Sequence, residues 1–306
     1  MKKLCVIGSL NTDLVTVIDR FPRPGETLEG KDFATYPGGK GANQAVALGK
    51  LGADVQMLGK LGDDLYGRQY LKVLEKAGVG SLGIEIENAT ASGIAVIEVE
   101  VSGENRIIII PGANGKVDRG FIDNRLGIIK ECDIFLLQLE IPLETVCHTV
   151  KLLKDHGKIV ILDPAPAREL PEEVFKGLDY ITPNETELEI LTGRQIKNES
   201  ELRAAAESLL DKGVGTVIAK AGKRGAYLID RNNFIHSPAY DVKVVDTTAA
   251  GDSFNAGFAY ALSNGMGLKE CGAYANAVAS LSTSGKGAQG AMPGIAQVMA
   301  LMGEMK

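Results

Sequence analysis

The sequence predicts an α/β fold: a doubly wound, mostly parallel sheet with helices on both faces, plus a small inserted antiparallel β lid. Two observations support this prediction. Short apolar, β-branched runs alternate with amphipathic helical patterns along most of the chain, as expected for strands buried on both faces and joined by helical crossovers. Two hairpin-like stretches, residues 14–36 and 92–110, interrupt that alternation and are assigned to the lid.

Five short, mostly apolar runs are expected to form strands of the large sheet. They occupy residues 4–9, 134–140, 159–165, 180–184 and 216–222. Helical periodicity predicts amphipathic helices at residues 42–51, 66–77, 143–154, 199–212 and 253–263. A further strand-like run, residues 242–245, comes before the last helix. This order of elements is typical of layered α/β proteins.

Each hairpin consists of a strand, a turn and a second strand, with turns expected at residues 21–25 and 102–105. In the second hairpin, alternate residues of 95–101 are apolar on one face, and residues 107–110 are apolar on both. One face is expected to close over a ligand and the other to pack on a second subunit, which gives a homodimer; packing within a single domain is the alternative. The lid is assigned residues 11–44 and 91–111, and the α/β domain residues 1–10, 45–90 and 112–306.

Composition excludes several classes of function. The 306 residues carry a net charge of -6, which gives no electrostatic footprint for nucleic acid or for an anionic membrane. The apolar start breaks at Asn11 and Asp13, and no stretch approaches the roughly 20 apolar residues that span a bilayer. We therefore expect a cytoplasmic protein. The cysteines contain no CxxC pair and the histidines no metal-ligand spacing, so reduced structural thiols are expected.

Two common nucleotide-binding signatures are missing from the glycine-rich segments. Gly39-Lys40 is followed by Gly41, so the phosphate loop GxxxxGK[ST] fails. The first strand runs into residues 8–11 without a GxGxxG pattern. The sequence therefore disfavours a P-loop NTPase and a nicotinamide enzyme.

Polar residues follow the first strand and open the first helix. Asn11 and Asp13 come just past the first strand, at the carboxyl end where open α/β sheets bind ligands. Residues 38–45 (GGKGANQA) contain three glycines that permit close backbone approach, while Lys40 and Asn43 can donate to hydroxyls. An amide and a carboxylate together suit a sugar diol. A polar turn with Asp13 as a local cap, and an ordinary helix start, are the alternatives.

The most informative segment is residues 246–254 (DTTAAGDSF). Small residues at a strand-to-helix turn leave amides of the helix N-terminus open, and those amides form an anion site with the helix dipole. Asp252 lies in the first turn, where the dipole is expected to favour its ionised form and make it a poor base. A simple helix N-cap would also place a carboxylate there, but it requires neither the small residues nor the second aspartate, Asp246.

Together these motifs resemble those of the ribokinase branch of the ribokinase-like (PfkB) carbohydrate kinases, over nearly the whole chain. The segments in family order are GSLNTD, GGKGANQA, QLE at 138–140, DPAPARELP, TPNETE, the glycines of KAGKRG, DTTAAGDSF and KGAQ. Two positions depart from the pattern. Asp163 stands where Asn is frequent, and Ala291 stands where Ser can occur.

The resemblance implies ATP-dependent phosphorylation of D-ribose to ribose 5-phosphate, with Mg²⁺ and K⁺ as cofactors. The implied sugar contacts are Asn11, Asp13, Gly39, Lys40, Asn43 and Glu140, the catalytic base is Asp252, and the anion hole is formed by Ala249, Ala250, Gly251 and Asp252. The implied nucleotide contacts are Asn184, Glu187, Lys220, Ala221, Gly222, Lys223, Gly225, Gly251 and Asn276. The implied potassium site comprises Asp246, Thr248, Ser282, Gly285, Gly287 and Ala291.

Other functions stay open on the residues alone. The NxxE pattern of Asn184 and Glu187 resembles the family's magnesium and phosphate motif, but an ordinary solvated helix start has the same composition. A silent sugar-binding protein and a nucleotide-binding scaffold are alternatives on the same fold. Within the family, fructose, 2-deoxyribose or a nucleoside is the alternative acceptor. Polar Lys40 and Glu140 favour a sugar, because a nucleoside base needs apolar surface.

Overall fold

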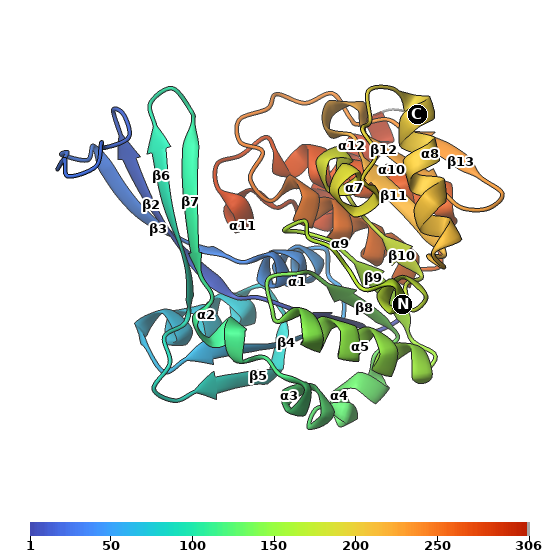
Figure 1. The fold of residues 1–306 in the computed structure, drawn as a ribbon, viewed down its shortest axis with the longest axis horizontal. Helices are drawn as coiled ribbons and strands as arrows, with labels where there is room; N and C mark the ends of the chain where they lie inside the picture. The colour runs from blue at the N-terminus through green and yellow to red at the C-terminus, as the bar shows by residue number, and fades with distance from the viewer. Residues whose placement is uncertain (305–306) are drawn as a thin grey trace.

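A nine-stranded sheet forms the centre of the molecule (Figure 1). This computed structural model describes residues 1–304. The strands are β1 (Leu4–Ile7), β4 (Val55–Gly62), β5 (Gly80–Glu87), β8 (Ile134–Leu137), β9 (Ile159–Leu162), β10 (Tyr180–Ile181), β11 (Thr216–Lys220), β12 (Ala226–Ile229) and β13 (Phe234–Ser237). Their order is β13-β12-β11-β10-β9-β8-β1-β4-β5, and all neighbours pair in parallel except at β12 and β13.

Helices cover both faces of this sheet (Figure 1). One face carries α1 (Lys40–Lys50), α2 (Leu65–Lys76), α9 (Ala250–Ser263), α10 (Leu268–Ser282) and α12 (Ile295–Glu304). The other carries α3 (Arg119–Asp123), α4 (Leu126–Glu131), α5 (Leu143–Asp155), α6 (Glu172–Phe175), α7 (Glu185–Thr192) and α8 (Glu199–Asp211). Within residues 1–304, none of these helices is long and apolar enough to cross a bilayer.

Two separate hydrophobic cores result from the alternation of side chains along each strand. Leu4 and Val6 of β1 belong to the core under α1 and α9, while Cys5 and Ile7 belong to the core under α5 and α8. Because both faces are covered, β1 is apolar at every position, as predicted for a parallel sheet buried on both sides. The doubly wound fold is confirmed.

The predicted elements occur, with shifted ends. The five predicted helices begin and end within three residues of the predicted positions. The predicted strands of the large sheet are longer than the observed ones, because their last residues leave the sheet as loops; the run 134–140, for example, pairs only to Leu137.

The run 242–245 is not a strand, so that prediction is wrong. Val244 and Val245 are 60% and 47% exposed, and the N–H of Val245 donates to the carbonyl of Thr283 at 2.8 Å rather than to a neighbouring strand. Its β-branched composition suits a strand, but among the described residues it pairs with neither sheet, and Val242 and Val244 line a cavity instead. The helix α9 therefore follows a loop and not a strand.

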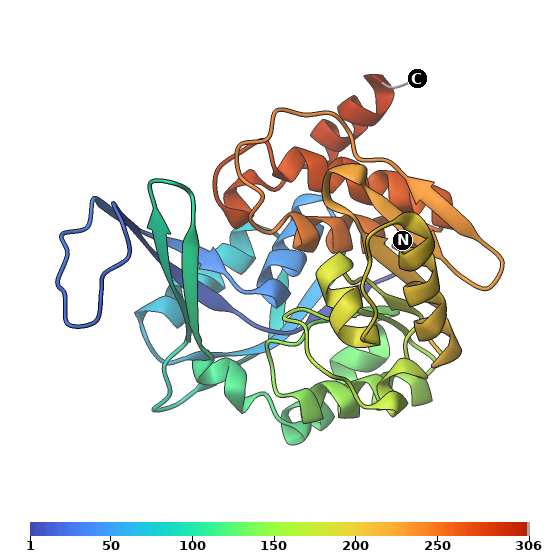
Figure 2. The same ribbon diagram turned by 45° about the horizontal axis from the view of Figure 1, so that its top comes forward.

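A separate four-stranded sheet projects from one side of the molecule (Figures 1 and 2). It consists, in the spatial order β3-β2-β6-β7, of β2 (Asn11–Ile18), β3 (Asp32–Gly38), β6 (Gly93–Glu100) and β7 (Asn105–Ile110). Each hairpin is antiparallel, as predicted, and the two hairpins join through parallel pairing of β2 with β6. We call this small sheet the lid.

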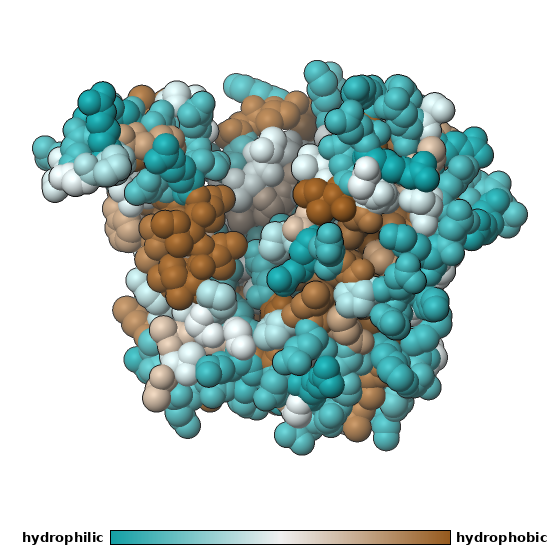
Figure 3. All heavy atoms as spheres, viewed as in Figure 1, coloured by the Kyte–Doolittle hydropathy of each residue, from teal (hydrophilic) through white to brown (hydrophobic). Residues whose placement is uncertain are grey.

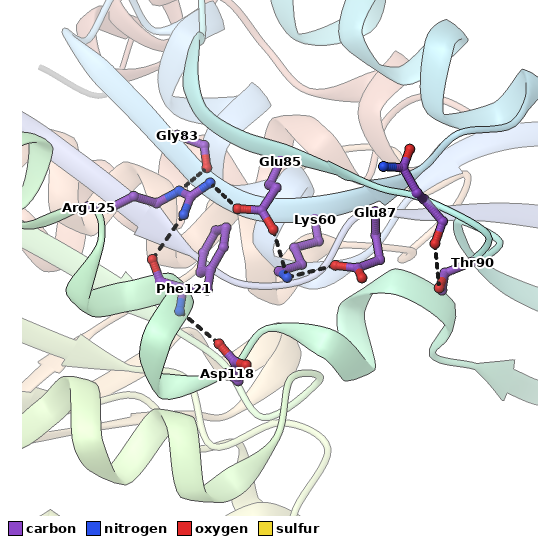
Figure 4. A network of polar contacts seen from close by, with 9 residues as sticks. Lys60, Gly83, Glu85, Glu87, Thr90, Asp118, Phe121 and Arg125 are labelled. Atoms are coloured by element: carbon purple, nitrogen blue, oxygen red, sulfur yellow. Dashed lines mark hydrogen bonds and ion pairs between the residues drawn. The ribbon is translucent and has the colours of Figure 1, made fainter.

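An ion-pair network fixes the edge strand β5 to the rest of the large sheet (Figure 4). Lys60 on β4 is only 7% exposed, and its Nζ lies 2.8 Å from Glu85 and 2.7 Å from Glu87 on β5. Arg125 donates to Glu85 at 2.8 Å and lies over the ring of Phe121, 3.6 Å from its centroid. A buried lysine is therefore compensated by two carboxylates on the neighbouring strand.

The strand order reverses at β1, which lies between β4 and β8. Ligands of open α/β sheets bind outside the carboxyl ends of the strands at such a switch point. The loops after β1, β8 and β9 meet the first turns of α1 and α9 here, because residues of these segments are joined by hydrogen bonds. This convergence is the candidate active site.

Candidate active site

The first lid strand carries two of the predicted sugar-binding residues. Asn11 and Asp13 are two positions apart on β2, so their side chains lie on the same face of the lid. Oδ1 of Asn11 accepts from Nδ2 of Asn114 at 2.8 Å, and Asn114 also bonds both backbone groups of Leu10. Asn114 belongs to the 3₁₀ helix Gly112–Lys116 that follows the lid, and no sequence pattern distinguished it. The alternative of a polar turn at Asn11 and Asp13 is wrong.

The loop after β8 is bound to the start of α1. Oε2 of Glu140 accepts from the hydroxyl of Ser9 at 2.5 Å and from the N–H of Lys40 at 3.0 Å. Gly39 has φ 87°, and a Cβ there would lie 2.6 Å from the backbone nitrogen of Asn11. Only glycine permits this approach. The predicted sugar residues from three segments are thus brought together.

The carboxylate of Asp252 is buried and held by α1. It is 5% exposed; Nδ2 of Asn43 donates to Oδ2 at 3.0 Å, and Nε2 of Gln44 donates to Oδ1 at 3.1 Å. Oδ1 of Asn43 in turn accepts from Nε2 of Gln289 at 3.0 Å. Gln44 and Gln289 lie within the motifs GGKGANQA and KGAQ, but no role was predicted for either side chain.

Burial sets the protonation of these carboxylates. It raises the pKa of Asp252 to about 6, against the opposing charge of Lys40 and with a further rise from Asp163. The expectation that the helix dipole keeps this pKa low is therefore wrong, because desolvation outweighs the dipole. Burial, with repulsion from Glu140 and Asp252, raises the pKa of Asp13 to about 7. Asp252 is thus a stronger base than an exposed aspartate and is still mostly ionised at neutral pH.

Lys40 keeps its charge in this acidic surrounding. Burial alone would lower its pKa, but four neighbouring carboxylates, foremost Asp252 and Asp163, raise the pKa above its usual value. The ammonium therefore offsets part of the negative charge that the carboxylates concentrate between the lid and the large sheet.

The N-terminus of α9 is open to an anion. Ala249, just before the helix, adopts the left-handed conformation with φ 59°, and no side chain caps this end of α9 in the described structure. Because Asp252 bonds to α1 and not to the amides of its own helix, the N-cap alternative for Asp252 is wrong. The amides of Gly251 and Asp252 lie in the first turn, where helix geometry leaves N–H groups without intrahelical partners, whereas the N–H of Ala250 donates to the carbonyl of Thr247 at 3.2 Å. Nζ of Lys220 lies 3.5 Å from where a Cβ on Gly251 would be.

A cavity of about 460 Å³ opens beside these amides. Among the residues predicted to contact the nucleotide, those in its lining are Lys220, Gly222, Lys223, Gly225, Gly251 and Asn276. Nδ2 of Asn276 is held by the carbonyl of Ser237 at 2.8 Å. Apolar walls come from Tyr240, Val242, Val244 and Phe254, for which no nucleotide contact was predicted. A cavity with apolar walls beside an anion site suits a nucleotide.

Three predicted nucleotide contacts lie outside that lining: Asn184 and Glu187, at the start of α7, and Ala221. The N–H of Ala221 donates to the carbonyl of Gly225 at 2.8 Å. Oδ1 of Asn184 accepts from the N–H of Glu187 at 2.8 Å, and Oε2 of Glu187 accepts from the N–H of Asn184 at 2.7 Å. The pair is therefore a capping box. Burial raises the pKa of Glu187, while Lys220 counteracts that rise.

The predicted potassium residues gather in two adjoining segments. Oδ1 of Asp246 accepts from the N–H of Thr248 at 2.9 Å, and Oδ2 accepts from the N–H of Gly287 at 2.9 Å. Gly285 lies against Ala291 of the short helix α11 (Ala288–Ala291). The hydroxyl of Ser282 donates within α10, to the carbonyl of Ala279 at 2.8 Å. In residues 1–304, no group of three or more His, Cys, Asp or Glu side chains is arranged to hold a metal ion.

Comparison with known proteins gives consistent matches over the whole chain. Residues 1–294 match the pfkB family of carbohydrate kinases. The chain is 42% identical to a deoxyribokinase of Salmonella typhi over 295 residues, 96% of each protein. It is also 42% identical to a ribokinase of Bacillus subtilis over 293 residues, 96% of this chain and 97% of the relative. The structure resembles a ribokinase of Arabidopsis thaliana in complex with ribose and ATP, with a TM-score of 0.93 and 35% identity over 98% of both chains.

Proposed function

The chain belongs to the pfkB family of carbohydrate kinases, and on that premise we propose that it transfers the γ-phosphoryl group of ATP to D-ribose, forming ribose 5-phosphate. The placement of Asp252 carries this proposal. Its carboxylate is held by Asn43, a predicted sugar contact, and its own helix begins at the nucleotide cavity. A single buried base thus lies between the acceptor side and the donor side.

The residues supply alignment and charge neutralisation, which are the main requirements of phosphoryl transfer. Asp252 orients the sugar hydroxyl and accepts its proton as the bond from oxygen to phosphorus forms. The amides of Gly251 and Asp252 hold the negative charge of the transferred group. The lid, whose four strands we propose as a separate domain within residues 11–44 and 91–111, closes over the sugar and excludes water that would otherwise accept the phosphoryl group.

Two cations belong to the proposal. Glu187 and Asn184 offer the hard oxygen donors that suit Mg²⁺, which when bound neutralises charge on the triphosphate. Asp246 ties the segments 246–248 and 285–287 together just before the anion site, and their carboxylate and carbonyl oxygens suit K⁺. The first of these segments leads directly into Ala249, so a cation that orders residues 246–248 also orders the anion-binding amides.

A second candidate acceptor is 2-deoxyribose, because the deoxyribokinase of Salmonella typhi and the ribokinase of Bacillus subtilis are equally similar to this chain. Ribose is preferred on physical grounds. We propose that Asn11 and Asp13 bind sugar hydroxyls, whereas both ends of the Asn43 side chain are already bonded to Asp252 and Gln289. A missing hydroxyl leaves a polar atom of the site unpaired at a cost of about 1–3 kcal/mol.

An acceptor panel tests this assignment. ADP release from Mg-ATP is measured with ribose, 2-deoxyribose, fructose and adenosine, and phosphorylated products are identified by mass. We expect ribose to give the highest kcat/KM. A tenfold higher kcat/KM with any other acceptor would overturn ribose as the substrate, and no ADP release with any of them would argue for a silent binding protein.

We also propose a homodimer formed through the lid, in a cytoplasmic protein. Every residue of β7 is exposed, and Ile107, Ile108, Ile109 and Ile110 are 54%, 65%, 45% and 41% exposed. Figure 3 shows an apolar surface over this part of the lid. An apolar strand of this size on the surface suits a subunit interface. Sedimentation should give a dimer for the wild type and a monomer for Ile108→Asp; a monomeric wild type at micromolar concentration contradicts the dimer.

A further inference from the structure

A buried carboxylate that has no role so far lies between the two halves of the site. Asp163 follows β9 and is 2% exposed. Its Oδ1 lies 2.9 Å from Nζ of Lys220, at the end of β11, and its Oδ2 accepts from Nε2 of Gln44, on α1, at 3.1 Å. The two oxygens therefore bind side chains from two separate elements, β11 and α1.

Lys220 connects Asp163 to the donor half. Its side chain is 13% exposed, lines the nucleotide cavity, and brings Nζ within 3.5 Å of the Cβ position of Gly251. A lysine ammonium on its flexible stem samples many positions unless a partner holds it. Asp163 is the partner that holds this ammonium beside the anion-binding amides.

Gln44 connects Asp163 to the acceptor half. Its Nε2 lies 3.1 Å from Oδ2 of Asp163 and 3.1 Å from Oδ1 of Asp252, so one amide nitrogen is shared by two carboxylates. Its Oε1 accepts from Nε2 of Gln138 at 2.7 Å. That bond fixes the orientation of the amide, because a flip would turn its oxygen toward two negatively charged groups.

We propose that Asp163 is a positioning residue for both halves of the transfer. One oxygen fixes the ammonium of Lys220 at the anion-binding amides, and the other fixes the base Asp252 through Gln44. Lys220 then acts as a catalytic residue that neutralises negative charge on the transferring phosphoryl group. This inference rests on the proposed function. In this arrangement the distance between the carboxylate of Asp252 and the ammonium of Lys220 depends on the buried side chain of Asp163.

The charges around Asp252 give this role a distinct signature. Asp252 faces Lys40 from α1, Asp163 from the loop after β9, and Asp13 from the lid. Removing the negative charge of Asp163 removes one of the causes that raise the pKa of Asp252. The acid limb of kcat against pH should therefore move to lower pH, which a loss of packing alone would not produce.

The test uses Asp163→Asn and Lys220→Met in the full chain. In Asp163→Asn the new side chain still offers an oxygen to Gln44, but its amide nitrogen turns a donor toward Lys220. We expect kcat to fall by about 10- to 100-fold in each variant, with a smaller change in the KM for sugar. Only Asp163→Asn should shift the acid limb. The double variant should lose little more than either single variant, because both remove the same contact.

Lys60→Met is the matched control. Lys60 is also a buried lysine paired with carboxylates, but its partners Glu85 and Glu87 lie at the sheet edge (Figure 4). This control should lose thermal stability and keep kcat. Binding of a non-hydrolysable ATP analogue is measured in all variants without sugar. This measurement tests the role of Lys220 at the nucleotide even if the wild type phosphorylates none of the sugars.

Two results would overturn the proposal. One is a folded Asp163→Asn with kcat within twofold of the wild type and an unshifted acid limb. The other is Lys220→Met with unchanged kcat and unchanged affinity for the analogue, which decides the matter even if Asp163→Asn does not fold. If wild-type activity is absent while Lys220→Met and Asp163→Asn both weaken analogue binding, the proposed acceptor fails and the positioning of Lys220 stands.

Discussion

Replacing Asp13 by asparagine should make the protein more stable and a poorer kinase. Burial and the charges of Glu140 and Asp252 raise the pKa of Asp13 from 3.8 to about 7. Between these two pH values the folded protein binds more protons than the unfolded chain, so the free energy of unfolding falls as pH rises through this window. An asparagine at this position carries no charge and avoids that loss.

The size of the effect follows from the pKa. At roughly 1.4 kcal/mol per pKa unit, the rise corresponds to about 4 kcal/mol at pH 8, which we halve to about 2 kcal/mol because the side chain is partly exposed. Such a gain raises the Tm by roughly 4 °C for a protein of this size. The sugar loses a charged acceptor for its hydroxyls, so its KM should rise by about 10-fold or more.

Thermal unfolding of the wild type and Asp13→Asn at pH 5 and pH 8, without sugar, measures the gain. We expect the variant to be the more stable protein at pH 8, with a clearly smaller difference at pH 5, where folded wild-type Asp13 is largely protonated. The KM for ribose is measured on the same samples. Equal stability at pH 8, or an equal gain at both pH values, would refute the raised pKa of Asp13.

Three further results are expected. The kcat with ribose should fall about tenfold per pH unit below about pH 6, because Asp252 must be ionised to accept the proton; a flat profile down to pH 5 would exclude it as the titrating base. Replacing K⁺ by a bulky organic cation at equal ionic strength should lower kcat, since the segment from Asp246 to Thr248 leads into the anion site; an unchanged rate counts against the cation site. Gln289→Leu should raise the KM for sugar severalfold, because the side chain of Asn43 loses its 3.0 Å contact with Gln289; an unaltered KM would show that Gln289 does not orient Asn43.

Local patterns predicted the elements better than the contacts between them. Apolar runs and helical periodicity located the strands and helices, since both depend on neighbours in sequence. Asn114 was missed because its partner Asn11 is 103 residues away and no motif joins them. The bond of Gln44 to Asp163 spans 119 residues and was missed for the same reason.

The raised pKa of Asp252 could not be predicted from the sequence either. The position of Asp252 in a first helical turn predicts a lowered pKa, whereas its pKa is raised because the packing of α1 against α9 removes it from water. Burial of that kind depends on the assembled site and not on the local pattern. The apolar run 242–245 was misjudged similarly, since composition does not show whether a sheet edge lies beside it.

The kcat of Asp252→Asn with ribose tests the central claim most directly. The substitution keeps the size of the side chain and removes the proton acceptor, so we expect kcat to fall by about 10² to 10⁴ while the affinity for ribose, measured by calorimetry, changes far less. A thermal transition must first show that the variant is folded. A folded Asp252→Asn that keeps more than about a tenth of the wild-type kcat would contradict the assignment of Asp252 as the base.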